Sequence, residues 1–371
     1  MALLEAAEWV SVELRAPAHS RLLDHCRLFA FAFLGLPLRV EQVLSGPLRR
    51  LDPMVAEVWR ATAELCAGQV QQGRARLMRC LPAADPRARR AIDRRLDRPP
   101  PLAGELLDER ARARLERLER EWDWARRYSP EHAEPRPIWT TWALAALLVI
   151  VFVAEMLHGS STDPETLFAL GALDSGRALA GEWWRIATAQ FLHYGPLHLV
   201  ANAGALLLLG GFVERRLGTL RYLFVYFAAG TLALSGFVAV VALGMRPHAV
   251  LLGASANVMG IVGATAAILA RGLWTEGARV AARPLVTIIF IVLGQAALDL
   301  TVKGLSFIGH ALGAVSGFVV AGLLLRLRIR TLALVFVGGL VVSSLLESWS
   351  ARRATTQESS PPEPSGPGSA P

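Results

Sequence analysis

Residues 253–270 read GASANVMGIVGATAAILA and contain no charged side chain. A helix of about 20 apolar residues crosses the roughly 30 Å hydrocarbon core of a bilayer, so this run is long enough to form a membrane span. Ser255 lies at its beginning, and His310 opens another apolar run further along the chain. Because ionisable groups at bilayer depth are costly, an intramembrane histidine indicates a functional site.

The whole chain is apolar for its size. It has 371 residues, of which 53% are hydrophobic, and its mean hydropathy is +0.39. These values predict a multi-span membrane protein. Only Lys303 among the 39 basic residues is a lysine, and the arginines concentrate in the first 136 residues. Contact with anionic membrane lipid explains this excess more simply than nucleic acid, so no nucleic-acid partner is expected.

The N-terminal part of the chain is predicted to be cytosolic. Its first residues lack the basic-then-apolar order of a signal peptide. The three cysteines, Cys26, Cys66 and Cys80, precede the first span without metal-ligand spacing, which fits a reducing compartment. Residues 1–98 read as short helices broken by prolines, hence a small soluble helical domain. This domain is interpreted either as a docking module for a cytosolic partner or as a folded spacer.

Residues 99–137 are predicted to form a Pro-rich linker followed by a charged amphipathic helix. One face of this helix carries Leu107, Ala111, Leu115, Leu118 and Trp122. Two interpretations stay open. The helix is either a solvated linker or a helix on the inner leaflet, with Trp122 and Trp124 directed toward lipid headgroups.

Hydropathy predicts an all-α, polytopic membrane helical bundle after this linker. Residues 138–328 form a six-span core, residues 329–349 a seventh span, and residues 350–371 a disordered tail. The seven spans are expected at roughly 139–157, 196–213, 219–244, 254–270, 284–300, 308–325 and 330–346.

The charges of the short loops predict the topology. Three alternate loops are rich in arginine, and the positive-inside rule places them in the cytoplasm. The N-terminus is therefore expected inside and, after an odd number of spans, the C-terminus outside. The arginine-rich loops carry Arg215, Arg216 and Arg221, then Arg271, Arg279 and Arg283, and then Arg326, Arg328 and Arg330.

In this topology the second, fourth and sixth spans run in the same direction, so polar groups in their first turns share one depth. These groups are His198 with Asn202, Ser255, and His310. A serine hydroxyl becomes a useful nucleophile when a base takes its proton, and histidine suits that task at neutral pH. No acidic residue lies in the fourth or sixth span, so Ser255 and His310 are predicted to form a dyad without a third member.

His198 and Asn202 are four residues apart and lie on one helical face. Together with the backbone N–H of Ser255 they can donate hydrogen bonds to a tetrahedral oxyanion. Zinc is disfavoured, because His193 and His198 are five residues apart and no His-Glu-x-x-His signature occurs. No metal or cofactor is expected.

Several ordered motifs between Leu167 and Leu325 resemble those of the rhomboid intramembrane serine proteases. The resemblance implies that Ser255 attacks, that His310 accepts and returns the proton, and that the substrates are single-span transmembrane proteins. The motifs are Gly181-Glu182-Trp183-Trp184-Arg185, His193 with His198 and Asn202, Glu214-Arg215 with Gly218, Gly253-Ala254-Ser255-Ala256, and His310-Ala311 with Gly313 and Gly317.

The resemblance also implies supporting roles for His193, Gly253, Trp184 and Arg185, cleavage near the outer face, and a six-plus-one arrangement of spans. A bacterial inner membrane is the expected location. Two positions depart from the family pattern. Ala256 replaces the glycine that follows the nucleophile, and Met259 stands where many members have an aromatic residue. Both are expected to modulate the rate.

Two other classes of function stay open. A rhomboid-like pseudoprotease would bind transmembrane clients without cleaving them, but the retained Ser255 and His310 favour a hydrolase. A transporter would be expected to carry more intramembrane charge and an inverted repeat of spans.

Overall fold

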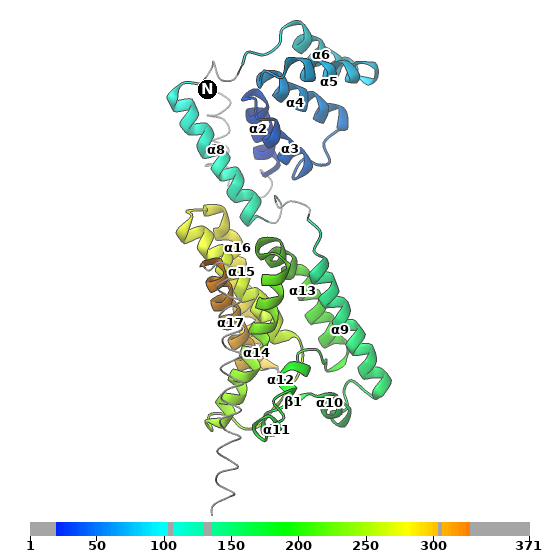
Figure 1. Ribbon diagram of the computed structural model, residues 1–371, viewed down its shortest axis with the longest axis vertical. Coiled ribbons are helices and arrows are strands. Elements are labelled where there is room, and N and C mark those ends of the chain that lie inside the picture. Colours follow the sequence, from blue (N-terminus) through cyan, green and yellow to red (C-terminus); the bar gives the residue numbers. More distant parts are fainter. Residues whose placement is uncertain (1–19, 103–106, 130–131, 133–135, 303–305, 327–371) are drawn as a thin grey trace, which may run out of the picture.

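The computed structural model describes residues 20–102, 107–129, 132, 136–302 and 306–326. Helices dominate this part of the chain, and Figure 1 shows them in two groups, an N-terminal group above a bundle of long helices. Helix α8 (Glu109–Tyr128) runs from the upper group down to the bundle.

Six helices are long and apolar enough to cross a membrane, which confirms the predicted all-α polytopic bundle. The predicted seventh span and tail, residues 329–371, lie outside the described residues. The six helices are α9 (Trp139–His158), α13 (Gly195–Leu217), α14 (Thr219–Ala242), α15 (Ser255–Thr275), α16 (Ala282–Thr301), which follows the short 3-10 helix η4 (Arg279–Ala281), and α17 (Phe307–Arg326).

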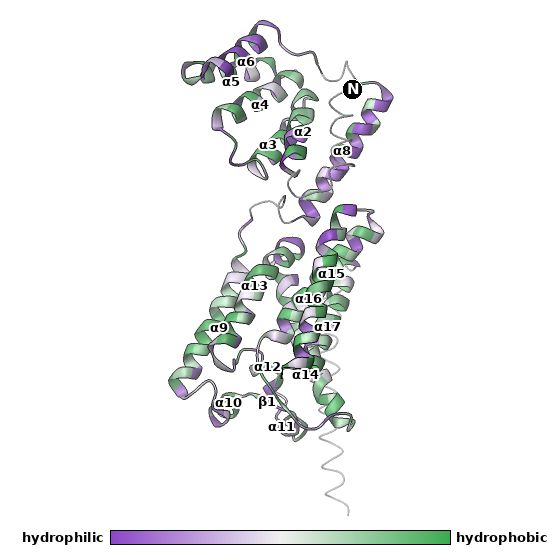
Figure 2. Cartoon of the chain, turned by 180° about the vertical axis from the view of Figure 1, so that it is seen from behind, coloured by the Kyte–Doolittle hydropathy of each residue, from purple (hydrophilic) through white to green (hydrophobic). Residues whose placement is uncertain are grey.

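The outward faces of these helices are apolar. Leu197, Leu208 and Phe290 expose 81%, 83% and 69% of their surface. Figure 2 shows hydrophobic residues along the bundle and hydrophilic residues on much of the N-terminal group. Continuous apolar surface of this kind is stable against lipid and not in water. The bundle is therefore a multi-pass membrane domain.

Helix α15 is the most buried of the six helices and lies at the centre of the bundle. Its closest neighbour is α17, and glycines allow the two backbones to approach. A side chain at Gly313 would collide with the carbonyl oxygen of Ala256, and one at Gly317 with that of Gly260. Small residues therefore line the contact between the two helices, whereas Gly309 faces Ser306 of its own segment.

Gly317→Ala is expected to lower the melting temperature of the purified protein in detergent. The added methyl group would press on the carbonyl oxygen of Gly260, and overpacking of this kind costs about 1–3 kcal/mol. Gly322→Ala is the matched control, since a methyl group there meets nothing within 4 Å. Equal melting temperatures for the two variants would contradict the tight backbone contact.

The segment between α9 and α13 folds into short elements that reach the loop before α15. Strand β1 pairs antiparallel with β2 (Val250–Leu251), so that Leu173 lies opposite Leu251. This pairing holds the chain just ahead of Ser255. The elements of the segment are α10 (Pro164–Leu170), β1 (Leu173–Asp174), α11 (Ser175–Leu179) and α12 (Arg185–Thr188).

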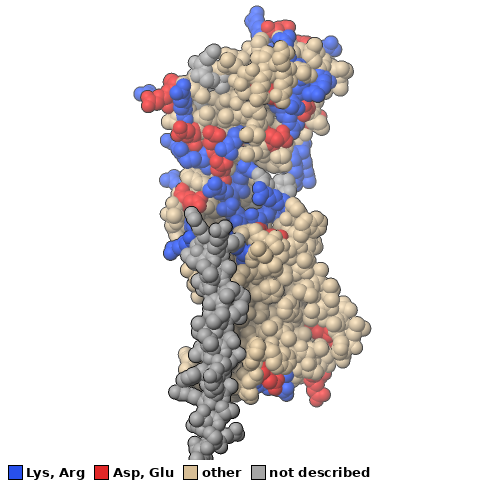
Figure 3. All heavy atoms as spheres, viewed as in Figure 1, with Lys and Arg blue, Asp and Glu red and all other residues tan. Residues whose placement is uncertain are grey.

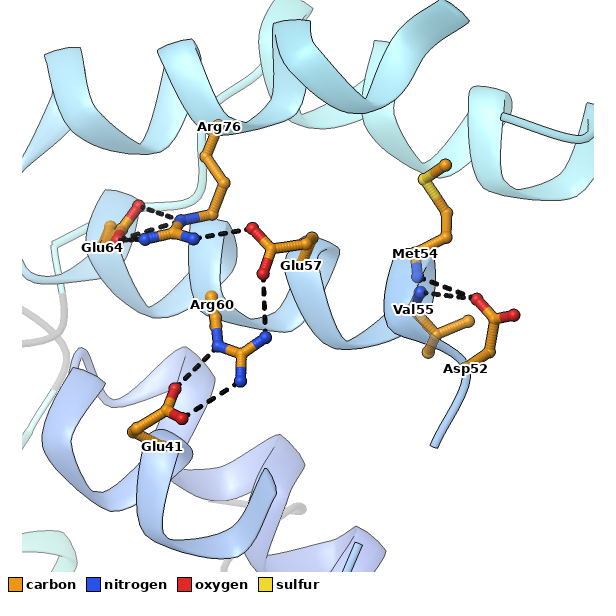
Figure 4. Close-up of polar contacts among 8 residues, drawn as sticks. All are labelled: Glu41, Asp52, Met54, Val55, Glu57, Arg60, Glu64 and Arg76. Carbon is orange, nitrogen blue, oxygen red and sulfur yellow. Dashed lines mark hydrogen bonds and ion pairs between the residues drawn. The ribbon is translucent and has the colours of Figure 1, made fainter. Parts of the chain in front are cut away.

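The N-terminal group is held together by an apolar core and by charged contacts between its helices. Figure 4 shows Arg76 bound to Glu57 and Glu64, and Arg60 bound to Glu57 and Glu41. Asp52, drawn in the same view, caps the N-terminus of α4. The helices of this group are α2 (Ser20–Phe33), α3 (Pro37–Ser45), α4 (Pro53–Cys66), α5 (Val70–Cys80), the 3-10 helix η2 (Leu81–Ala83), α6 (Pro86–Asp97) and α8 (Glu109–Tyr128).

Helix α8 belongs to this N-terminal core. Ala111, Leu118 and Trp122 are buried there, and the indole N–H of Trp122 donates to the side-chain oxygen of Gln42 on α3 (3.0 Å). The interpretation that directs Trp122 toward lipid headgroups is therefore wrong, and the helix is not a free linker either. Its apolar face finds a protein partner because α2 and α3 present a complementary apolar surface.

The last turn of α8 contacts the membrane bundle. Tyr128 is buried against Gly272 near the end of α15, and the guanidinium group of Arg216 lies over its ring at 5.5 Å. Burial, assisted by the nearby carboxylate of Glu276, raises the pKa of Tyr128 to about 12. The N-terminal group is thus packed directly on the end of α15.

Candidate active site

The loop before α15 is shaped by Gly253. Its φ of +115° is in the region that favours glycine, and its N–H donates to the carbonyl oxygen of Ala189 (2.8 Å). A Cβ atom at this position would lie 2.9 Å from Nε2 of His198 and 3.5 Å from Nδ2 of Asn202. The absent side chain therefore leaves room for both residues beside the loop that leads to Ser255.

His198 and Asn202 occupy the first two turns of α13 and face this loop. The backbone N–H of Tyr194 donates to Nδ1 of His198 (3.3 Å), which leaves the ring proton on Nε2, the nitrogen nearer to Gly253. Asn202 is buried, and its amide nitrogen has no hydrogen-bond partner within the described part of the chain. Two side-chain donors are thus available next to the loop.

His193 packs against His198. It is fully buried, and its ring lies edge-on to that of His198 with a centroid distance of 5.4 Å. Burial, with a smaller contribution from His198, lowers the pKa of His193 to about 4, so this ring is neutral at physiological pH. The backbone N–H of His193 donates to the carboxylate of Glu155 on α9 (3.2 Å). His193 therefore has a structural role here.

Ser255 is the first residue of α15 and is half-buried. Its hydroxyl group makes no hydrogen bond to any described residue, so it is not bonded to His310 in this structure. The packing of α15 on α17 still brings the two residues to the same end of the helix pair, because Gly313 contacts Ala256 and His310 lies one turn before Gly313. Catalytic hydrogen bonds are often long without substrate.

His310 lies in the first turn of α17, where Ser306 accepts a hydrogen bond from the N–H of Gly309 and helps to start the helix. The imidazole is buried. Because Gly313 of α17 contacts Ala256 of α15, His310 lies near the beginning of α15.

The sequence prediction that His310 lacks an acidic partner is wrong. Nδ1 of His310 is 2.8 Å and 2.9 Å from the two carboxylate oxygens of Asp299, in the last turn of α16. The prediction considered only the fourth and sixth spans. The fifth span runs in the opposite direction, so its last turn reaches the depth at which the sixth begins, and an acidic residue at that position is the signal that was missed.

Asn257 is a second residue that the sequence did not single out. It is fully buried, and its amide nitrogen donates to the side-chain oxygen of Gln190 (2.7 Å) and to the carbonyl oxygen of Tyr226 (3.0 Å). Gly230 on α14 leaves the space that this amide occupies. Asn257 therefore fixes the first turn of α15, and with it Ser255, against two other parts of the bundle.

Trp184 and Arg185 lie away from these groups and shape the segment before α13. Arg185 is buried and donates to the carbonyl oxygens of Phe168 (2.8 Å) and Ala172 (3.1 Å). Its guanidinium group also lies over the ring of Trp184 at 4.5 Å. The contacts bind α10 to α12, so Arg185 holds the segment together without reaching the candidate nucleophile.

The order of these elements and motifs can be compared with known proteins. Residues 180–327 match the model of the Rhomboid domain. This stretch contains the Gly253 loop, both α13 donors, Ser255 and His310.

The chain contains a rhomboid domain. It is 34% identical over 186 residues to the rhomboid protease GluP of Bacillus subtilis, which covers 50% of this chain and 34% of that protein. It is 33% identical over 174 residues to RHOMBOID-like protein 5 of Arabidopsis thaliana, covering 46% and 53%.

Another relative carries a different description. The inactive RHOMBOID-like protein 8 of Arabidopsis thaliana is 32% identical over 129 residues, or 34% of this chain and 35% of that protein. The chain thus spans between a third and about half of the length of these rhomboid relatives. Similarity to rhomboid proteins is therefore compatible with both an active and an inactive protein.

The two departures from the rhomboid motifs are both buried. Ala256 has its methyl group in the interior, and its carbonyl oxygen faces Gly313 of α17. Met259 is also buried and belongs to the core of the membrane domain. An unbranched, flexible methionine fills irregular space well, so the rhomboid bundle accommodates this residue in its core.

Proposed function

We propose that this chain is an intramembrane serine protease that cleaves transmembrane proteins. The observation that carries the proposal is the Gly253 loop, which lies against His198 and Asn202 two residues before Ser255. A loop that leads to a nucleophile and is lined by hydrogen-bond donors is the arrangement that acyl transfer requires. His310, at the same end of the helix pair, supports the assignment of a general base.

In the proposed reaction Nε2 of His310 takes the hydroxyl proton of Ser255 as Oγ attacks the carbonyl carbon of the scissile peptide bond. The resulting oxyanion accepts hydrogen bonds from Nε2–H of His198, the amide of Asn202 and the N–H of Ser255. His310 then returns the proton to the leaving amine. A water molecule attacks the acyl-enzyme in the same way and releases Ser255.

We further propose that the substrates are single-span transmembrane proteins cut near the outer face of a bacterial inner membrane. A helical peptide bond has its carbonyl group engaged, so cleavage requires a segment that leaves the helix easily. Figure 3 supports the cytoplasmic assignment of the N-terminus, since basic residues gather on the N-terminal group and at its junction with the bundle. Such charge suits contact with anionic lipid at the inner surface.

The similarity to a relative described as inactive favours one alternative, a protein that binds transmembrane clients without cutting them. Both functions predict client binding, and they differ only in chemistry. A cytosolic partner of residues 1–98 remains a separate proposal, to be tested by deleting that region.

Ser255→Ala in the full-length protein is expected to remove all measurable cleavage of a model single-span substrate in liposomes. It is also expected to remove labelling by a fluorophosphonate, because this probe reacts only with an activated serine. The alternative, a protein that binds clients without cleaving them, would be favoured by a different result. In that result the folded wild-type protein cleaves none of several substrates and is not labelled by the probe. Ser160→Ala, at an exposed serine after α9, is the matched control.

A further inference from the structure

The carboxylate of Asp299 contacts His310 but has no role in the proposed Ser255–His310 dyad. Its side chain is 1% exposed, and that of His310 is 9% exposed. Within the described residues, His310 is the only basic group paired with this carboxylate. A carboxylate buried at membrane depth is unfavourable unless it is paired and hydrogen-bonded, so its presence needs an explanation.

We propose that Asp299 is a positioning residue that completes a Ser255–His310–Asp299 triad, an inference that rests on the proposed protease function. In such a triad the carboxylate accepts the Nδ1 proton of the histidine, holds the imidazole in the tautomer that leaves Nε2 free, and stabilises the imidazolium ion formed during reaction. Asp299 itself touches neither substrate nor the reacting atoms.

The contacts of the carboxylate agree with this role. Both of its oxygens lie within 2.9 Å of Nδ1, so the imidazole must donate from that nitrogen. The amide nitrogen of Gln295, one turn earlier on α16, donates to the same carboxylate at 2.8 Å. The second hydrogen bond keeps the carboxylate oriented toward His310. Nε2 is then the nitrogen available to Ser255.

The same contact also links two helices, which supplies a competing explanation. Asp299 is on α16, the least buried of the membrane helices, and His310 is on α17. If the ion pair only fastened α16 to the bundle, its removal would lower stability or weaken substrate binding. It would leave the catalytic step of bound substrate intact. The two roles therefore differ in whether kcat or KM changes.

Asp299→Asn in the full-length protein is expected to lower kcat for a model transmembrane substrate by about 10²–10⁴-fold, since the corresponding change in a serine protease triad lowers kcat by roughly 10⁴. KM is expected to stay within about threefold of wild type, as is normal when an interaction specific to the transition state is lost. Glu165→Gln, which removes one negative charge from an exposed residue of α10, is the matched control and should leave both constants unchanged.

Two results would overturn the triad. The first is a kcat for Asp299→Asn within threefold of wild type while Ser255→Ala is inactive, which leaves a dyad protease. The second is a raised KM or a lowered melting temperature with unchanged kcat, which leaves a purely structural link. Equal turnover by wild type and Ser255→Ala would instead remove the proposed protease function itself.

A measurement that needs no substrate distinguishes failure of the triad from failure of the protease function. Nitrogen NMR of histidine-labelled protein in detergent is expected to show the His310 ring protonated on Nδ1 in the wild type and to lose that single tautomer in Asp299→Asn. His310→Ala assigns the signal. An unchanged tautomer in Asp299→Asn overturns the positioning role, whatever the cleavage assay shows.

Discussion

His310→Ala is expected to lower kcat for cleavage of a transmembrane substrate by about 10⁶-fold, close to the effect of losing the nucleophile itself. Without the imidazole no described side chain is positioned to take the proton of Ser255, so the hydroxyl group stays unreactive. Labelling by a fluorophosphonate should fall in parallel. The measurement is the rate of cleavage in liposomes together with the rate of labelling in detergent.

His158→Ala provides the matched control for this prediction. His158 is an exposed histidine at the end of α9, where Nδ1 of its ring lies 2.8 Å from the carbonyl oxygen of Ala154. Its removal changes the same chemical group without touching the site. Cleavage and labelling by His310→Ala at rates near those of His158→Ala would exclude His310 as the base.

Gly253→Ala is expected to lower kcat by roughly 10²–10³-fold, the usual cost of losing one oxyanion donor. The new methyl group would occupy the space of the His198 ring, while the amide of Asn202 would be at ordinary van der Waals distance. His198 would have to move away from the loop, and the backbone would be strained at a φ of +115°. The measurement is kcat for a model substrate, compared with the melting temperature of the same variant.

Gly244→Ala separates these two causes. Gly244 also has a positive φ, +68°, but a methyl group there meets nothing within 4 Å. It therefore places an alanine at a positive φ, in the milder left-handed region, without displacing the His198 ring. Equal loss of kcat in both variants would show that an alanine at a positive φ explains the effect and would remove the support for His198 as a donor.

Membrane spans were predictable because apolar length is a property of the chain itself. All six described spans lie close to their predicted positions, because a helix of about 20 apolar residues is more stable in a bilayer than in water. Because alternate spans enter the membrane from the same side, one depth was predicted for His198, Asn202, Ser255 and His310. The structure places His198 and Asn202 beside the Gly253 loop, which leads to Ser255.

Contacts between separate segments were not predictable in the same way. Trp122 lies in a helix whose sequence pattern is that of a surface helix. It is buried in protein because it packs against the apolar faces of α2 and α3. Asn257 looks like an ordinary polar residue in a span until Gln190 and Tyr226 are found beside it. Asp299 lies in the last turn of the fifth span, and its contact with His310 forms because that turn reaches the depth at which the sixth span begins.

One helix connects the two halves of the molecule. The 21 residues of α15 begin at Ser255, and near its other end Gly272 bears directly on Tyr128 of the N-terminal group. A helix of that length is a rod of about 30 Å, stiff because it is buried along most of its course. Ser255 and the contact with Tyr128 therefore lie at opposite ends of one helix. We expect a change in the tilt of α15 at Gly272 to displace Ser255 as well, at the far end of the same helix.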